Sequence, residues 1–137
     1  MKVLIDSDVI IDLLIDRKPF SEHSIDLLSL CENGKITGYW TPVMISNIYY
    51  ILRKYTSEQN ARTKISDLNS ILEVLMIDKS VIQNALESTF KDFEDAIQNF
   101  SAEIHEEIEI IITRNESDYK HSRLSIFSPI DFLRIHS

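Results

Sequence analysis

Four aspartates stand at points of the chain where a carboxylate can act on a ligand. Asp6 ends a short apolar run, with Asp8 two residues on, and Asp118 follows a strongly apolar run in the second half. Asp92 and Asp95 open a helical pattern three residues apart, so their carboxylates share one face of its first turn. Two carboxylates about 4 Å apart repel by on the order of 4 kcal/mol at an effective dielectric constant of roughly 20. If these groups converge, they need raised pKa values or a bound cation, and all-oxygen ligands favour Mg²⁺ or Mn²⁺.

Each of these aspartates also has a purely structural interpretation. Asp6 can cap the turn between a strand and a helix, Asp95 is a favourable acid in a first helical turn, and Asp118 is an ordinary loop acid. The metal hypothesis takes Asp6, Asp95 and either Asp92 or Asp118 as catalytic ligands of one or two ions.

The negative charge of the chain is concentrated in two segments. The chain holds 22 acidic and 14 basic residues, for a net charge of −8. Residues 87–118 and residues 1–16 carry the excess of acids, whereas the rest of the chain is slightly basic. The total argues against a broad basic face for nucleic acid. A bound divalent ion reverses the local sign, however, so an RNA substrate is compatible with this distribution.

Several classes of protein are excluded by composition. The length of 137 residues fits a single domain over residues 1–137. The two glycines, Gly34 and Gly38, open neither a GxGxxG nor a GxxxxGK[ST] phosphate loop. Cys31 is the lone cysteine and cannot form an internal disulfide. The first apolar run contains acids, so we expect neither a signal peptide nor a membrane span, and a cytoplasmic protein.

Apolar runs alternate with amphipathic segments along the whole chain. Strands are predicted at residues 2–5, 35–40, 73–77, 109–113 and 125–127. Helices are predicted at residues 9–16, 24–32, 43–55, from 57 to about 72, 79–89, 93–104 and from 129 onward, with a polar loop at 114–122. This order predicts an α/β fold, a three-layer α/β/α sandwich around a central, mostly parallel five-stranded sheet.

In such a sheet the ligand site lies beyond the carboxyl ends of the strands, where the strand order switches. The first strand ends at Asp6, and the fourth ends at Thr113, followed by Arg114 and Asn115. The helix after the second strand presents Asn47 near its beginning. The acids of both negative segments are therefore expected to meet at one edge of the sheet.

Four segments in this order resemble the motifs of the PIN-domain nucleases. They are VLIDSDVIIDLL, TPVMISNIYYILRK, FEDAIQNFSA and IITRNESDY, and together they extend over nearly the whole chain. The resemblance is strongest to the branch with Asn-Ile-Tyr-Tyr in the second motif and Asp-Phe-Glu-Asp-Ala in the third. Many small PIN proteins are the toxins of VapBC-type toxin–antitoxin pairs.

The resemblance implies a ribonuclease that cuts phosphodiesters of single-stranded or structured RNA with a carboxylate-held Mg²⁺ or Mn²⁺. Asp6 and Asp95 match the first and third acids of the family. The second acid falls on Asn47 and the fourth on Asn115, which leaves Asp92 or Asp118 as substitutes. Both amides remove negative charge from the expected site.

Further residues are candidates for supporting roles. Thr113 and Ser46 can position water or the phosphate, and Asn47 and Asn115 can orient ligands. The candidate RNA-binding residues are the basic side chains near strand and helix ends: Arg53, Lys54, Arg114 and Lys120, with Arg17, Lys18 and Arg123 as further candidates. The resemblance also suggests an antitoxin partner and a homodimer, for which the apolar side chains of Ile48, Tyr49, Ile51 and Leu52 are available.

Three alternative functions remain open at this point. Asn47 and Asn115 are compatible with an inactive PIN-like domain that binds RNA or a partner without cutting. Asp6-Ser7-Asp8-Val9 fits the DxDx[TV] opening of haloacid-dehalogenase-type phosphatases, with Asp6 as nucleophile, but the chain lacks their later Gly-Asp pair. Response-regulator receivers share the fold class and an acid such as Asp78 after a strand, but they also need a lysine where Phe127-Ser128-Pro129 stands.

Overall fold

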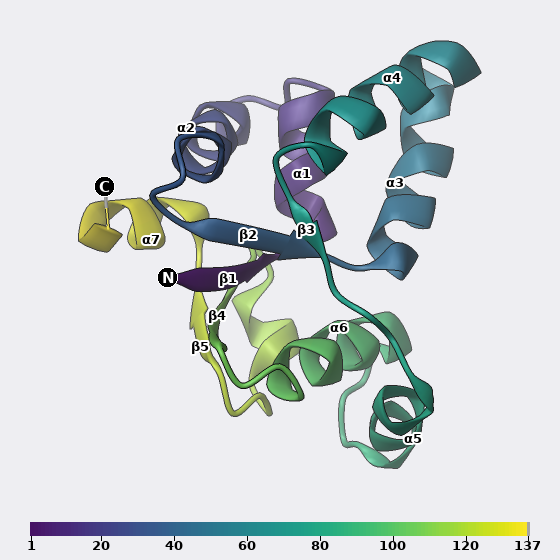
Figure 1. The fold of residues 1–137 in the computed structure, drawn as a ribbon, viewed down its shortest axis with the longest axis vertical. Helices are drawn as coiled ribbons and strands as arrows, with labels where there is room; N and C mark the ends of the chain where they lie inside the picture. The colour runs from purple at the N-terminus through teal and green to yellow at the C-terminus, as the bar shows by residue number, and fades with distance from the viewer. Residues whose placement is uncertain (137) are drawn as a thin grey trace.

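The computed structural model describes residues 1–136, in which strands alternate with helices as the sequence predicts (Figure 1). The strands are β1 (Lys2–Ile5), β2 (Thr37–Trp40), β3 (Glu73–Val74), β4 (Ile108–Ile112) and β5 (Ser125–Phe127). The helices are α1 (Ser7–Leu14), α2 (Phe20–Glu32), α3 (Pro42–Tyr55), α4 (Glu58–Asn69), α5 (Lys79–Glu87), α6 (Phe93–Glu103) and α7 (Pro129–His136), with a 3₁₀ helix η1 (Glu116–Tyr119).

The five strands of the described residues form one sheet in the order β3-β2-β1-β4-β5, and every neighbouring pair is parallel. β1 is central and pairs with β2 on one side and β4 on the other. The chain builds the sheet outward from β1 in one direction and then, from β4, in the other. The switch in strand order therefore lies between β1 and β4, where open α/β sheets bind ligands.

Helices cover both faces of this sheet, which gives the predicted three layers (Figure 1). α1, α2, α3 and α4 lie on one face, with α7 packed beside α2, and α5 and α6 lie on the other. Because both faces are covered, the middle strands are apolar throughout: Val3, Leu4 and Ile5 of β1 are fully buried, as are Ile111 and Ile112 of β4.

Side-chain caps begin the helices that follow strands at the carboxyl edge. The Asp6 carboxylate accepts a hydrogen bond from the amide of Ser7 at 2.8 Å, and Thr41 caps α3 through the amide of Met44. Asp92 caps α6 by accepting from the amide of Asp95 at 2.9 Å. The structural interpretation of Asp6 as a cap is therefore correct, and it is compatible with a second role.

Three predicted elements differ from the structure. β2 begins at Thr37 because the amides of Lys35 and Ile36 still donate to the carbonyl of Leu30, which closes the end of α2. β3 contains only two of its five predicted residues, because it is an edge strand and its continuation turns into solvent at Met76. The predicted polar loop at 114–122 contains η1, whose last residue, Tyr119, is fully buried.

Within residues 1–136, no helix has the length and apolar character needed to cross a membrane.

Candidate functional site

Asp6 lies at the centre of the carboxyl edge and is almost completely buried. Its backbone amide extends the β1–β4 pairing by donating to the carbonyl of Ile112. Beyond its capping bond, the carboxylate accepts hydrogen bonds from Thr113 Oγ1 at 2.9 Å and from the Tyr119 hydroxyl at 3.2 Å. Burial raises the pKa of Asp6, and these hydrogen bonds oppose the rise only in part. The fold thus holds a buried carboxylate in a fixed orientation.

Asp95, in the first turn of α6, faces the same point from the other side of the sheet. Its Oδ1 lies 3.5 Å from the Tyr119 hydroxyl, so this hydroxyl is within hydrogen-bond distance of both Asp6 and Asp95. Burial, the charge of Asp6 and the charges of Asp92 and Asp118 raise the pKa of Asp95 to about 7. The structure therefore brings the two strongest candidates together, and we call Asp6, Asp95 and the Tyr119 hydroxyl between them the carboxylate site.

Asp92 and Asp118 lie on the solvent side of Asp95. With Asp95 they line a cavity of about 160 Å³, which also contacts Lys120. Asp92 is already occupied as the α6 cap, whereas Asp118 contributes its charge to Asp6 and Asp95. Among the four main RNA-binding candidates, Lys120 alone lines this cavity.

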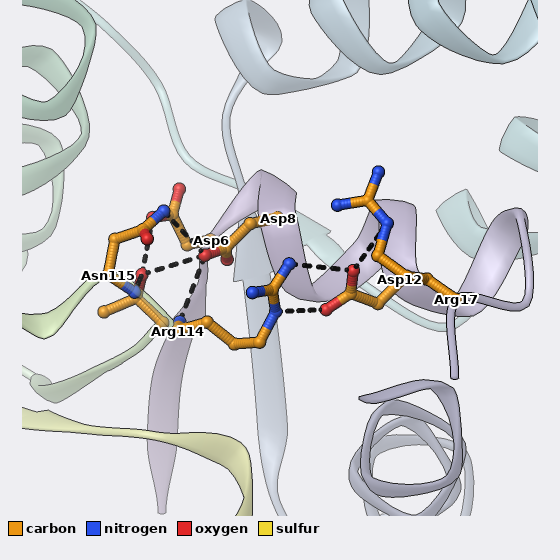
Figure 2. A network of polar contacts seen from close by, with 7 residues as sticks. Asp6, Asp8, Asp12, Arg17, Arg114 and Asn115 are labelled. Carbon is orange, nitrogen blue, oxygen red and sulfur yellow. Dashed lines mark hydrogen bonds and ion pairs between the residues drawn. The ribbon is translucent and has the colours of Figure 1, made fainter. Parts of the chain in front are cut away.

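Asp8, one turn into α1, is a second carboxylate beside Asp6 that the sequence did not single out as a ligand. Its Oδ2 accepts hydrogen bonds from the backbone amide of Arg114 and from Asn115 Nδ2, both at 3.1 Å, and lies 3.4 Å from Thr113 Oγ1 (Figure 2). Burial, followed by the charge of Asp6, raises the pKa of Asp8 to about 7. Its other oxygen, Oδ1, is buried and has no hydrogen-bond partner among the described residues.

Arg114 reaches away from the carboxylate site, toward the fully buried Asp12 on α1 (Figure 2). Its Nε lies 2.5 Å from Asp12 Oδ2 and its Nη2 lies 3.1 Å from Asp12 Oδ1, which raises the pKa of the guanidinium. The guanidinium also lies 4.0 Å from the ring centre of Phe20, and Arg17 Nε approaches Asp12 at 3.7 Å. Arg114 is thus engaged within the protein, and its bidentate pair anchors the turn after β4. A charge at Asp12, inside an otherwise apolar helix, was the sequence signal of this pair.

The α3 candidates divide between contacts with α6 and positions remote from the site. Asn47 Nδ2 donates to Glu94 Oε2 at 2.9 Å, which links the start of α3 to α6. Ser46 is exposed and lines a groove between α3 and α4. Arg53 and Lys54 lie in the last turn of α3, about 15 Å along the helix from its first turn. Neither side chain is placed at the carboxylate site.

The apolar residues considered for a homodimer are only partly available. Ile48 and Leu52 are buried in the protein's own core, at 0% and 2% exposure. Ile51 is exposed, and Tyr49 is half-buried. A dimer surface on α3 can therefore use only the second pair.

The donor chemistry of the carboxylate site fits a hard divalent cation. Within residues 1–136, no three His, Cys, Asp or Glu side chains form a ready-made group that could hold a metal ion. Mg²⁺ nevertheless needs only one or two protein carboxylates, since water and substrate phosphate complete its octahedron. The mutual repulsion that raises the pKa of Asp95 is the electrostatic condition that a bound cation relieves.

The raised pKa values predict an unusual pH dependence of stability. Asp8 and Asp95 titrate near pH 7 in the folded protein but near about 3.9 when unfolded. The folded state therefore binds more protons between these values, and stability falls as pH rises through that window. In EDTA, we expect a lower melting temperature at about pH 8 than at about pH 5.5, and a flatter profile in the Asp8→Asn/Asp95→Asn variant. A wild-type protein that is equally stable or more stable at the higher pH would contradict these directions.

The fold and this site define a doubly wound α/β protein with an acidic centre at the switch point of its sheet. The chain belongs to the PIN-domain family: residues 2–117 match the family model described as PIN domain. It is 27% identical over 123 residues to Ribonuclease VapC1 of Aquifex aeolicus (strain VF5), covering 86% of this chain and 84% of that protein.

Solved structures share the fold at low sequence identity. VapBC-1 from nontypeable Haemophilus influenzae superposes with a TM-score of 0.71 at 14% identity, covering 95% of this chain and 99% of that one. A toxin–antitoxin complex from Klebsiella pneumoniae gives a TM-score of 0.69 at 21% identity, with 93% and 97% covered. These likenesses confirm the expected PIN-like sandwich.

Proposed function

We propose that this single-domain protein, residues 1–137, is a Mg²⁺- or Mn²⁺-dependent endoribonuclease. The observation that carries the proposal is the convergence of Asp6 and Asp95 on the Tyr119 hydroxyl at the switch point of the sheet. Membership of the PIN-domain family and the likeness to a protein named a ribonuclease support the choice of RNA as substrate.

The chain's own residues contribute positioning and charge. Thr113 and Tyr119 hold Asp6 in place, and Tyr119 also fixes the distance between Asp6 and Asp95. Lys120, beside the cavity, balances the charge of an incoming phosphate. A divalent ion held by Asp6 and Asp95, with help from Asp118 or Asp92, would polarise the scissile phosphate and lower the pKa of an attacking water.

The proposal is tested by incubating the purified protein with labelled single-stranded and structured RNAs. Cleavage is expected with millimolar Mn²⁺ or Mg²⁺, loss of cleavage with EDTA, and recovery when the metal is restored. Equal cleavage in the presence of EDTA would exclude the metal mechanism.

A domain that binds RNA or a partner without cutting is the second candidate. Asn47 is engaged by Glu94, and neither Asn47 nor Asn115 can supply the charge of an acid. Calorimetry separates the two functions: RNA binding in a protein that takes up no Mn²⁺ at millimolar concentration would favour the binding module.

We also infer that the protein is the toxin of a toxin–antitoxin pair and acts in the cytoplasm. The structural relatives include a toxin–antitoxin complex that covers almost the whole chain, which supports a cognate antitoxin as partner. A homodimer through the exposed part of α3 is a further proposal. Co-expression with the product of a neighbouring gene, followed by size-exclusion chromatography, tests both assemblies.

A further inference from the structure

Asp8 has a carboxylate oxygen that the protein leaves without a partner. Its Oδ2 has three donors within 3.4 Å, all from the turn that follows β4, whereas Oδ1 is buried and accepts from none of the described residues. A buried carboxylate oxygen without a donor is destabilising unless a ligand satisfies it. The three donors also fix the orientation of the Asp8 side chain, so this oxygen is held in place before any ligand arrives.

The negative charge of Asp8 belongs to the same electrostatic group as the carboxylate site. Thr113 Oγ1 lies 2.9 Å from Asp6 Oδ2 and 3.4 Å from Asp8 Oδ2, so one hydroxyl bridges the two carboxylates. The charges of Asp6, Asp95 and Asp8 all raise the pKa of the Tyr119 hydroxyl. No basic side chain among the described residues neutralises Asp8, because Arg114 gives it only a backbone amide and directs its guanidinium to Asp12.

Asn115 supplies the complementary half of this arrangement. Its side chain lacks a charge, and its Nδ2 donates to Asp8 at 3.1 Å, while its backbone amide donates to Thr113 Oγ1 at 3.0 Å (Figure 2). An aspartate at position 115 would place a second carboxylate against Asp8 and repel it. The pair is therefore built as one acid and one amide, with the acid on α1.

We propose that Asp8 is a third carboxylate ligand of the divalent metal ion, and that Asn115 is the positioning residue that orients it. The inference rests on the proposed metal-dependent function and names the residue that supplies the charge missing at position 115. Asp6 and Asp8 then bind from the end of β1 and the start of α1, and Asp95 binds from α6.

The test measures Mn²⁺ binding directly, by isothermal titration calorimetry and by the rise in melting temperature that Mn²⁺ produces. Asp8→Asn keeps an acceptor for Arg114 and Asn115 but removes the charge, and we expect Mn²⁺ affinity to fall by at least about tenfold. The exchange variant Asp8→Asn/Asn115→Asp moves the carboxylate across the same hydrogen bond. It is expected to bind Mn²⁺ within about threefold of the wild type and to bind even if Asp8→Asn alone folds poorly. Asp26→Asn, on the exposed face of α2, is the matched control and should bind as the wild type does.

Each outcome decides a separate question. Unchanged Mn²⁺ affinity in Asp8→Asn would overturn the assignment of Asp8 as a ligand while leaving the proposed function intact. Loss of binding in Asp8→Asn without recovery in the exchange variant would overturn the role given to Asn115. A wild-type protein that binds no Mn²⁺ would overturn this inference and the metal-dependent function together.

Discussion

Replacing Asp6 with asparagine is expected to reduce RNA cleavage by at least about 100-fold and to leave the protein folded. Even residues that only orient metal ligands change affinity or activity by about 10–100-fold, and Asp6 is proposed as a direct ligand. Asparagine keeps the capping acceptor for Ser7, and the hydroxyls of Thr113 and Tyr119 can rotate to accept from its amide. Because burial raises the pKa of Asp6, loss of its charge should not lower the melting temperature near about pH 8.

Both halves of this result are measurable. Initial cleavage rates at saturating Mn²⁺ give the catalytic loss, and thermal melting in EDTA gives the stability. Asp131→Asn, on the exposed side of α7 and far from β1 in sequence, serves as the control of equal charge change. Cleavage by Asp6→Asn within about threefold of the wild type would show that the reaction does not use the buried carboxylate.

The largest expected effect on stability comes from Arg114→Met. Asp12 is fully buried, and Arg114 forms the bidentate pair that compensates its charge. Removing one partner of a buried pair costs about 3–5 kcal/mol of unfolding free energy, because the other charge remains buried. Arg17 approaches Asp12 at 3.7 Å and can recover part of this cost, so we expect a loss near the lower end of that range.

Denaturant unfolding of two further variants separates pairing from packing. Arg123→Met removes an arginine that is 90% exposed and 3.9 Å from Glu103, and its cost should stay below about 1 kcal/mol. The double variant Asp12→Leu/Arg114→Met removes both charges and should recover most of the stability lost by Arg114→Met. If Arg114→Met alone unfolds with the same free energy as the wild type, the Asp12 charge is compensated by other groups.

The layers of the fold were predictable because each element carries a local signal. Residues 108–112 read as a fully apolar strand, which is the pattern of a parallel strand buried on both faces. Asp6 and Asp95 were predictable for a related reason: each follows a local boundary, and parallel strands end at a common edge. The weak point was β3, where an apolar pattern did not reveal that the strand pairs on one side only and ends after Val74.

The contacts within the site could not be predicted, since they depend on register between distant segments. Arg114 and Asp12 are 102 positions apart, and the pairing of Ile5 with Ile112 decides that they meet. The same register turns the backbone amide of Arg114 toward Asp8. Tyr119 was predicted to lie in a polar loop, yet its ring is buried and its hydroxyl reaches Asp6. A tyrosine in a polar stretch with little else that is apolar was the available signal.

The pairing of β1 with β4 also governs when the protein can become active during its own synthesis. Asp6 reaches its hydrogen-bonding partner Thr113 only after 107 further residues have been added, and Tyr119 is added later still. Until β4 has emerged and inserted beside β1, the growing chain has neither the hydroxyl that holds Asp6 nor the turn that holds Asp8. Closing so long a loop is a late event in folding. A ribosome that makes this protein therefore carries no assembled site until translation of the chain is nearly finished.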